Sequence, residues 1–365
     1  MALNELLIRD FRNLSRVQLD KLVTRGFNFF YGLNGSGKTS LLEAIYYLAH
    51  KRSFRSLNAK RLIRHDAERF SVFSKIISQN EQHIPLGVER LTSGESTVRL
   101  DSKEVDSLSE LANVLPTRLI NVHSHLMLEG SPLFRRKYLD WGIFYLNDDF
   151  LPIWYRFKRF LRQRNAALRH QASPQELASW TREVVAAGLA FHALRQAYFD
   201  QLLPIIREIL SGFFDIRQLK ISYKAGWDES ASYEEILASS LAQDLERGHT
   251  HYGPHRADLS VSINRVSAKD VLSTGQQKLL VCGMILAQGA LLARLTQRRP
   301  IYLIDDLPAE LDIDSRRWLI STLAEQQAQI FVTAVEQEAM SGILAQMDEP
   351  VKMFHVKQGM VEEIS

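Results

Sequence analysis

Hydrophobic and polar positions change their period several times along the chain, and the first changes favour an α/β arrangement. Residues 5–11 are extended in pattern, residues 27–31 form an apolar run, and the apolar positions within residues 41–49 have helical spacing. Three short β-rich runs follow, and they predict an antiparallel sheet. These runs are residues 69–77, 84–90 and 96–105. Strands and helices in this order are typical of an α/β domain.

The period becomes helical between residues 131 and 213. Ser173, Pro174 and Glu176 form an N-cap, a first-turn proline and a capping box. They predict a long helix, and Pro204 is expected to kink or end it because proline lacks a backbone donor and crowds the preceding turn. The helical block is roughly a hundred residues, too short for an extended coiled-coil arm with sustained heptads.

The α/β pattern then returns. Residues 258–263 alternate like a strand, residues 276–295 resemble a buried helix, and residues 300–305 form a short apolar strand that ends in acid. The sequence therefore predicts an α/β lobe interrupted by a mainly helical insertion. The predicted first lobe comprises residues 1–125 and 245–365, and the inserted second lobe comprises residues 126–244.

The composition agrees with two compact units. The chain has 365 residues, of which 45% are hydrophobic and 24% are charged, which excludes collagen-like, disordered and low-complexity classes. The longest charge-free apolar stretch, residues 279–293, has 15 residues and is shorter than the roughly 18 that cross a bilayer. We therefore expect no membrane contact, and a cytoplasmic location that also suits the single cysteine, Cys282.

The net charge of +3 names no partner, but its distribution is uneven. Residues 50–65 carry Lys and Arg without any acid, and residues 131–170 carry nine Lys or Arg against three Asp. Such stretches attract nucleic acid, although a solvated helix face produces the same pattern. The candidate DNA contacts are Arg52, Arg55, Arg61, Arg64, Lys158 and Arg162.

A glycine-rich loop provides the strongest chemical motif. It reads GLNGSGKT and consists of Gly32, Leu33, Asn34, Gly35, Ser36, Gly37, Lys38 and Thr39. It lies between an apolar strand and a periodic helix, as a phosphate-binding P-loop requires. Lys38 is expected to reach the β- and γ-phosphates of ATP, and the Thr39 hydroxyl is expected to bind Mg²⁺.

A second motif supplies acids for the same chemistry. Residues 301–306 read IYLIDD, the pattern of a buried parallel strand whose carboxyl end meets the phosphates. We assign Asp305 to the Mg²⁺ shell and Asp306 to water positioning or general base catalysis.

A third segment, LSTGQ at residues 272–276, directly precedes the predicted buried helix. Ser273, Gly275 and Gln276 suit an anion at a helix start, although the string alone is only a helix cap. The segment resembles the LSGGQ-type signature of ABC ATPases, and residues 310–312, which end in Asp312, resemble their D-loop. This resemblance implies an ABC-type ATPase head, a P-loop lobe with a mixed sheet, in which two copies sandwich ATP between one copy's glycine loop and the other's signature.

The chain as a whole resembles the RecF family more closely than transporter ATPases or SMC proteins. Matching segments occur in that family's order along nearly the whole chain. They read LLIRDFRN (6–13), LEAIYYL (42–48), SFRS (53–56), GSPLFRRKYLD (130–140), QRNAAL (163–168), YGPHRAD (252–258) and LIDDLPAELD (303–312).

The family resemblance implies an ATP-driven switch that dimerises on ATP and binds double-stranded and gapped DNA. It also implies work with RecR and RecO to load RecA during repair, replication restart and SOS induction, with slow ATP hydrolysis. Arg12, in the FRN turn, is expected to reach the nucleotide.

Some positions depart from the family pattern. Arg118 stands where a Q-loop glutamine is expected, and Val122 and His123 replace a proline and an acid. His249, His251 and His255 suggest a metal site only weakly, because no Cys or acid cluster completes it. Two alternatives stay open: a transport or small-molecule NTPase without a DNA role, and a passive DNA-binding scaffold that binds ATP without turnover.

Overall fold

A computed structural model describes the chain except residues 79, 106, 307–310, 339–341, 343–347 and 365. The chain forms two compact units. Unit 1 comprises Met1–Ser124 and Leu292–Ser365, and unit 2 comprises His125–Leu291. The first boundary lies within a residue of the predicted one. The second lies at residues 291 and 292 rather than 244 and 245.

Residues 245–291 belong to unit 2 because their main partners are there. Strand β10 (Asp258–Ile263) pairs antiparallel with β9 (Leu219–Lys224). The Gln288 side chain donates hydrogen bonds to the Tyr138 carbonyl at 2.6 Å and to the Tyr198 hydroxyl at 2.9 Å. The α/β sequence pattern therefore resumes within unit 2, before the chain re-enters unit 1 at Leu292.

Unit 1 contains a mixed six-stranded sheet in the order β15-β14-β3-β13-β12-β8. Only β15 is antiparallel to its neighbour, and the strands of IYLI and QIFVTA are buried throughout, as expected in a parallel sheet covered on both faces. The strands are β3 (Gly26–Tyr31), β8 (Thr117–Ile120), β12 (Ile301–Ile304), β13 (Gln329–Ala334), β14 (Val351–Lys357) and β15 (Met360–Ile364).

The second sheet of unit 1 is antiparallel, as the sequence predicts, in the order β2-β1-β4-β5-β6-β7. Its buried side chains share one core with helix α1 and with β12, β13 and β14 of the first sheet. The strands are β1 (Ala2–Phe11), β2 (Leu14–Leu19), β4 (Arg69–Ile77), β5 (His83–Leu91), β6 (Ser96–Leu100) and β7 (Lys103–Glu104). The helices are α1 (Lys38–His50), η1 (Ala59–Leu62), α2 (Leu108–Val114) and α11 (Ile313–Glu325).

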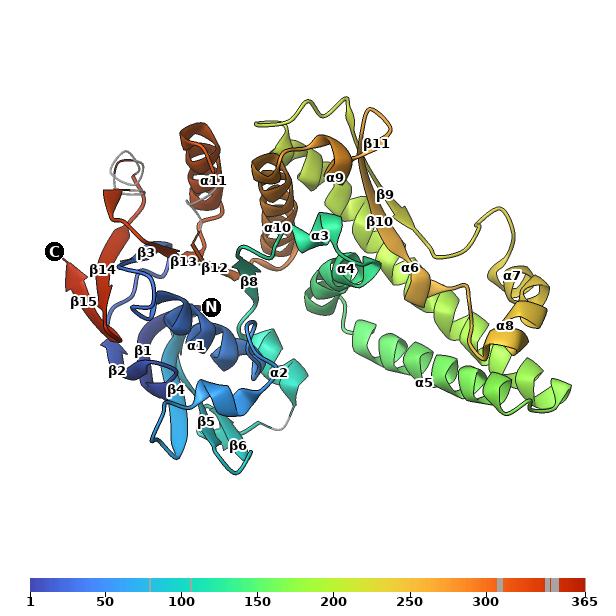
Figure 1. Cartoon of the computed structure of the whole chain (residues 1–365), viewed down its shortest axis with the longest axis horizontal. Coiled ribbons are helices and arrows are strands. Elements are labelled where there is room, and N and C mark those ends of the chain that lie inside the picture. The colour runs from blue at the N-terminus through green and yellow to red at the C-terminus, as the bar shows by residue number, and fades with distance from the viewer. Residues whose placement is uncertain (79, 106, 307–310, 339–341, 343–347, 365) are drawn as a thin grey trace. The chain divides into compact units, whose positions relative to one another are not determined.

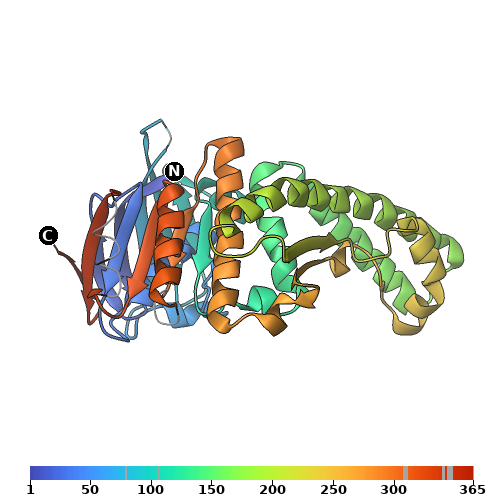
Figure 2. The same cartoon turned by 90° about the horizontal axis from the view of Figure 1, so that it is seen from above.

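Unit 2 is built on helices, and the longest is α6 (Pro174–Leu210), the yellow-green helix of Figures 1 and 2. Ser173 caps α6 as predicted, but Pro204 does not end it. Buried Leu202, Ile205 and Ile206 flank the proline, and their packing offsets the lost hydrogen bond. The other elements are α3 (Leu126–Glu129), α4 (Pro132–Leu146), α5 (Phe150–Arg169), α7 (Tyr233–Ser239), α8 (Leu241–Arg247), η2 (Pro254–Arg256), β11 (Val266–Ser267), α9 (Ala268–Val271) and the start of α10 (Thr274–Thr296).

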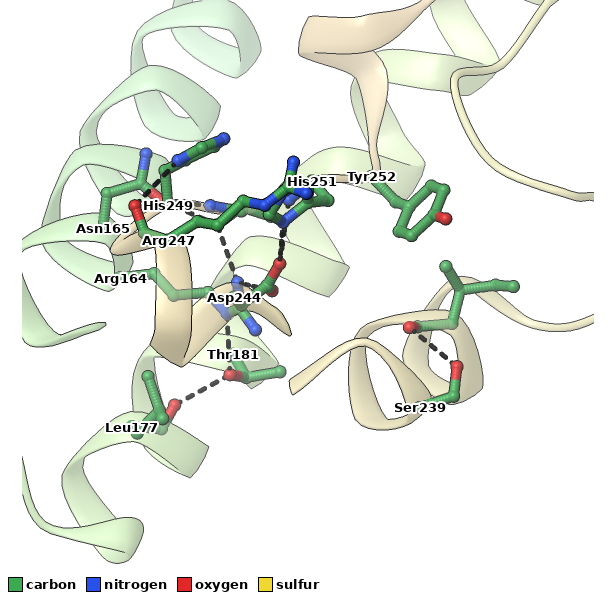
Figure 3. Close-up of polar contacts among 12 residues, drawn as sticks. Arg164, Asn165, Leu177, Thr181, Ser239, Asp244, Arg247, His249, His251 and Tyr252 are labelled. Carbon is green, nitrogen blue, oxygen red and sulfur yellow. Dashed lines mark hydrogen bonds and ion pairs between the residues drawn. The ribbon is translucent and has the colours of Figure 1, made fainter. Parts of the chain in front are cut away.

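A buried ion pair and a hydrogen bond from its arginine join three of these helices (Figure 3). Arg164 of α5 donates to Asp244 of α8 at 2.8 Å, and both side chains are fully buried. Arg164 also donates to Thr181 of α6 at 3.0 Å, and His251 bonds the second Asp244 oxygen at 2.8 Å. His251 is thereby hydrogen-bonded to the acid of this ion pair. No group of three or more His, Cys, Asp or Glu that could hold a metal ion occurs within the residues that the structure describes.

One helix of the described chain, α10, has the length and apolar character of a membrane span, with a mean hydropathy of 1.8 over its most apolar window. The fold buries 72% of that window. A core helix of a folded protein has the same length and apolar character.

Candidate nucleotide-binding site

The glycine loop joins the end of β3 to the start of α1, as the motif predicts. Gly37 is the N-cap of α1 with φ 121°, and no side chain caps the helix, so its first N–H groups are open to a ligand. Gly32 passes so close to β14 that a Cβ atom there would lie 2.1 Å from the Val356 carbonyl oxygen. Both positions therefore require glycine.

Lys38 points back into this loop. Its Nζ donates to the carbonyl oxygens of Gly32 at 2.5 Å and Leu33 at 3.0 Å. Burial lowers the pKa of the Lys38 ammonium, and the charges of Asp306 and Asp305 oppose that shift. The lysine is held as a preformed cation beside two carboxylates.

The two acids follow β12, as predicted. The Thr39 hydroxyl donates to Asp305 Oδ1 at 2.9 Å, so the two predicted Mg²⁺ ligands lie in contact. Burial raises the pKa of Asp305, against the hydrogen bonds from Thr39 and Thr333. A hydroxyl and a carboxylate are hard oxygen donors that suit Mg²⁺, which usually completes its shell with phosphate and water oxygens.

Thr333, the last residue but one of β13, connects the two acids. Its hydroxyl donates to Asp305 Oδ1 at 2.9 Å and accepts from the Asp306 backbone N–H at 2.9 Å. Asp306 has φ 53°, a left-handed conformation that this contact holds. The sequence reasoning gave Thr333 no role. The only available signal was its position at the end of a second apolar strand.

These groups line a cleft of about 490 Å³ in unit 1. Basic and polar side chains from the first 63 residues complete its wall. The lining residues are Arg12, Asn13, Asn34, Gly35, Gly37, Lys38, Thr39, Ser40, Arg55, Arg61, Ile63, Asp305, Asp306 and Thr333. An excess of cations facing two carboxylates suits a polyphosphate with a divalent cation.

Arg12 lies at this cleft, as expected, but a buried acid that the sequence analysis overlooked fixes its orientation. Glu43 of α1 is fully buried and accepts from Arg12 Nε at 2.9 Å and Nη2 at 2.7 Å. It also accepts from the Ser53 hydroxyl and lies 3.7 Å from the Arg55 guanidinium. Glu43 thus holds two of the arginines that line the cleft.

The arginines of the basic segment that follows α1 lie in two different places. Arg55 and Arg61 line the nucleotide cleft, although the sequence analysis proposed them for DNA. Arg52 and Arg64 are exposed, and Arg64 lies 3.6 Å from Asp10. The remaining two predicted DNA contacts, Lys158 and Arg162, are exposed on α5 of unit 2.

The signature-like segment belongs to unit 2. The Ser273 hydroxyl accepts from the Gln276 N–H at 3.3 Å, and the Gln276 side chain accepts from the Ser273 N–H at 3.1 Å. This reciprocal cap starts α10 and leaves both residues exposed, with Gly275 half-buried between them. The segment therefore forms a capped helix start at which Ser273 and Gln276 are accessible.

The D-loop candidate lies at the start of α11. Asp312 is its N-cap and accepts from the Ser315 N–H at 2.8 Å, a bond that lowers the pKa of Asp312. The preceding residue 310 lies outside the described residues. The structure thus gives Asp312 a local capping contact.

The positions that depart from the family pattern lie in β8 and directly after it. Arg118 lies within β8, opposite Tyr302 of β12, and is not among the described residues that line the cleft. Val122 and His123 follow in an exposed turn, where the His123 N–H donates to Asn121 Oδ1 at 2.9 Å. These departures leave the cleft described above intact.

Comparison with known proteins agrees with this architecture. The fold matches a solved Smc head bound to the C-winged helix domain of ScpA, with a TM-score of 0.60, 14% identity and coverage of 100% of this chain and 98% of that one. At that identity the match shows the fold alone. Fold and site together define an ABC-type ATPase head, and residues 2–362 match the family model described as the RecF/RecN/SMC N terminal domain.

Closer relatives narrow the class. The chain is 42% identical over 364 residues to the DNA replication and repair protein RecF of Azotobacter vinelandii, covering 100% of this chain and 99% of that protein. It is 40% identical over 363 residues to RecF of Cellvibrio japonicus, covering 99% of each. It also matches the recombination mediator protein RecF–ATPrS of the RecFOR pathway, with a TM-score of 0.83, 25% identity and coverage of 100% and 98%. The chain belongs to the RecF family of DNA replication and repair proteins.

Proposed function

We propose that this protein is an ATP-dependent DNA-binding recombination mediator with slow ATPase activity. The observation that carries the proposal is the convergence of Lys38, Thr39, Asp305 and Asp306 on one cleft beside an uncapped helix start. A solved structure is described as the recombination mediator protein RecF–ATP, which supports ATP as the ligand.

Each residue has a distinct task in this proposal. Lys38 exchanges its two carbonyl partners for the β- and γ-phosphate oxygens, since a charge-assisted bond to phosphate is stronger than one to a neutral carbonyl. Thr39 and Asp305 would hold Mg²⁺, which would neutralise phosphate charge. Asp306, fixed through Thr333, orients or deprotonates the attacking water.

ATP binding is proposed to pair two copies of the chain. Ser273, Gly275 and Gln276 lie at an accessible helix start that can face the γ-phosphate bound by the partner copy. Asp312, at the start of α11, is proposed to lie at the same junction between copies.

Ser273→Arg is expected to preserve ATP binding and to abolish ATP-dependent dimerisation. Arginine removes the cap acceptor and places a large side chain where the partner's phosphate must fit. Sedimentation velocity with a non-hydrolysable ATP analogue measures the dimer fraction, and a fluorescent analogue measures binding. Ser267→Arg, a change at the exposed N-cap of α9 in the same unit, is the matched control and should dimerise normally. If Ser273→Arg also prevents ATP binding by the monomer, the in-trans role is incorrect.

DNA is the proposed ligand of the ATP-bound protein, and the relatives' description as DNA replication and repair proteins supports this. The partners proposed are double-stranded and gapped DNA, RecR, and RecO and RecA downstream during repair, replication restart and SOS induction in the cytoplasm. Exposed Arg52, Arg64, Lys158 and Arg162 are the phosphate contacts proposed. Phosphate contacts of this kind bind with little sequence preference.

DNA affinity is expected to rise when ATP is added and to fall steeply with salt. Each phosphate contact adds roughly 0.9 to the negative slope of log affinity against log salt. Fluorescence anisotropy of duplex and gapped DNA, with and without ATP, measures both effects. A DNA affinity that does not change when ATP is added favours a transport or small-molecule NTPase. ATP binding without hydrolysis favours a passive DNA-binding scaffold. A salt-independent affinity contradicts the phosphate contacts.

A further inference from the structure

Helix α5 is unusually basic, and only part of that charge is neutralised. Its sequence from Phe150–Arg169 contains five Arg and one Lys and no acid. Arg164 is buried against Asp244, and Arg156 lies 3.2 Å from Glu183 of α6. For the other four cations, no carboxylate lies within ion-pair distance in the part of the chain that the structure describes. They are Lys158, Arg159, Arg162 and Arg169, and all four are exposed.

An exposed tyrosine lies in the same row. Tyr155, Lys158, Arg159 and Arg162 are spaced by three or four residues and therefore share one face of α5. The Tyr155 side chain is 62% exposed, although a ring of this size usually buries much of its surface. The opposite face of α5, which carries Phe157 and Arg164, is buried. We call Tyr155, Lys158, Arg159 and Arg162 the α5 stripe.

The neighbouring aromatic residue fixes the stripe. Lys158 Nζ lies 4.0 Å from the centre of the Trp154 ring, a cation–π distance. The Trp154 and Tyr155 rings meet edge to face with centroids 4.9 Å apart. The exposed Tyr155 ring therefore contacts the Trp154 ring, which also contacts the Lys158 ammonium, and contacts that restrict side chains lower the entropy lost when a ligand binds.

We propose that the α5 stripe binds single-stranded DNA, with one unpaired base stacked on Tyr155 and the adjacent phosphates on Lys158, Arg159 and Arg162. This rests on the proposed DNA-binding function and names the form of DNA that this site takes. A cationic row alone binds duplex and single strands alike, because both present phosphates. An open aromatic ring within the row adds affinity only for a base that is free to leave its own stack. The stripe thus recognises the unpaired strand at a gap or junction through Tyr155, whereas its three cations can contact the phosphates of either form of DNA.

The test compares two DNA molecules: a blunt duplex and the same duplex with a single-stranded tail. Affinities are measured by anisotropy on the full-length protein with a non-hydrolysable ATP analogue. Tyr155→Ala is expected to weaken tailed-DNA binding between about 5-fold and 150-fold, the range for loss of one stacked base. Blunt-duplex affinity should change by less than about 2-fold. Tyr155→Trp, which keeps a stacking ring, should restore the tailed-DNA affinity.

Two further variants separate the contributions. The double variant Arg159→Gln with Arg162→Gln should reduce the slope of log affinity against log salt for the tailed DNA. The reduction should be close to the amount that two phosphate contacts contribute. Leu189→Ala removes an exposed apolar side chain of α6 and should change neither affinity. Circular dichroism and urea unfolding of each variant establish that the fold is retained.

The outcomes distinguish this inference from the function on which it rests. Equal losses on both DNA molecules, or none on either, would overturn base stacking at Tyr155. If the paired arginine variant also binds normally, the α5 stripe faces another class of partner, such as an acidic protein surface. If wild-type protein binds neither DNA at any salt concentration, the proposed function itself fails.

Discussion

Lys38→Met is expected to weaken ATP binding by about 100-fold or more and to abolish ATP-dependent dimerisation. Lys38 is the buried cation of the glycine loop, with its Nζ 2.5 Å and 3.0 Å from two loop carbonyl oxygens. Methionine keeps most of the side-chain length and removes the charge. Each lost hydrogen bond to a charged phosphate costs about 1.5–3 kcal/mol, and two such bonds give at least this change.

The fold should tolerate this substitution. Burial lowers the pKa of the Lys38 ammonium because desolvation disfavours the charged form, so a neutral side chain of similar length should fit the same place. Isothermal titration calorimetry measures the ATP affinity, and sedimentation velocity measures the dimer. Lys60→Met, which removes an exposed lysine of the basic segment away from the cleft lining, is the control and should bind ATP normally. Unchanged ATP affinity in Lys38→Met would rule out this cleft as the nucleotide site.

Asp306→Asn is expected to slow ATP hydrolysis by about 10²- to 10⁴-fold, the usual contribution of a general base, and to leave ATP binding intact. The closed dimer should therefore accumulate in ATP. Asparagine has the same shape, and it tolerates the left-handed backbone that Asp306 adopts at φ 53°. The backbone bond from residue 306 to Thr333 is also unaffected by the change.

Single-turnover phosphate release measures the chemical step, and light scattering with ATP measures the dimer fraction. The control is Asp314→Asn on α11, whose side chain is 83% exposed and lies near Arg317 rather than in the cleft. It should hydrolyse ATP at the wild-type rate. Equal dimer fractions for wild type and Asp306→Asn would assign the hydrolytic role to another residue.

The two predictions separate binding from hydrolysis at one site. Lys38→Met should behave as a monomer with any nucleotide, whereas Asp306→Asn should remain paired long after wild-type dimers have separated. DNA binding should follow the dimer in both variants. A variant that dimerises without binding DNA would separate pairing from the proposed DNA role.

Much of the nucleotide site could be predicted because its motifs are local. The glycine loop requires positive φ at positions such as Gly37, and glycine is the residue that adopts positive φ without strain, so the sequence indicates the loop directly. The apolar strand before Asp305 and the cap at Ser273 are equally local. The antiparallel pairing of residues 69–100 also followed from short-range alternation and turns, and the structure confirms it.

Contacts between distant segments could not be predicted in this way. Thr333 reaches Asp305 because β12 and β13 pair in parallel with Ile304 opposite Val332, which puts the residues that follow at the same level. Glu43 appears in the sequence as one more polar position of an amphipathic helix. Its burial depends on Arg12 and Ser53 arriving from either side. In the sequence, Arg55 and Arg61 cannot be distinguished from the other cations of the basic segment. Only the fold places these two arginines in the wall of the cleft.

The sequence by itself determined the α/β head, the phosphate loop, the acidic strand end and the family. Backbone geometry, capping and strand burial leave their marks within a few neighbouring residues, so these features can be seen without coordinates. Only the tertiary structure decided where the second unit ends, which acid orients Arg12 and which arginines face the nucleotide cleft. Strand register and helix packing join residues far apart in the chain, and no local pattern encodes the partner that each side chain meets.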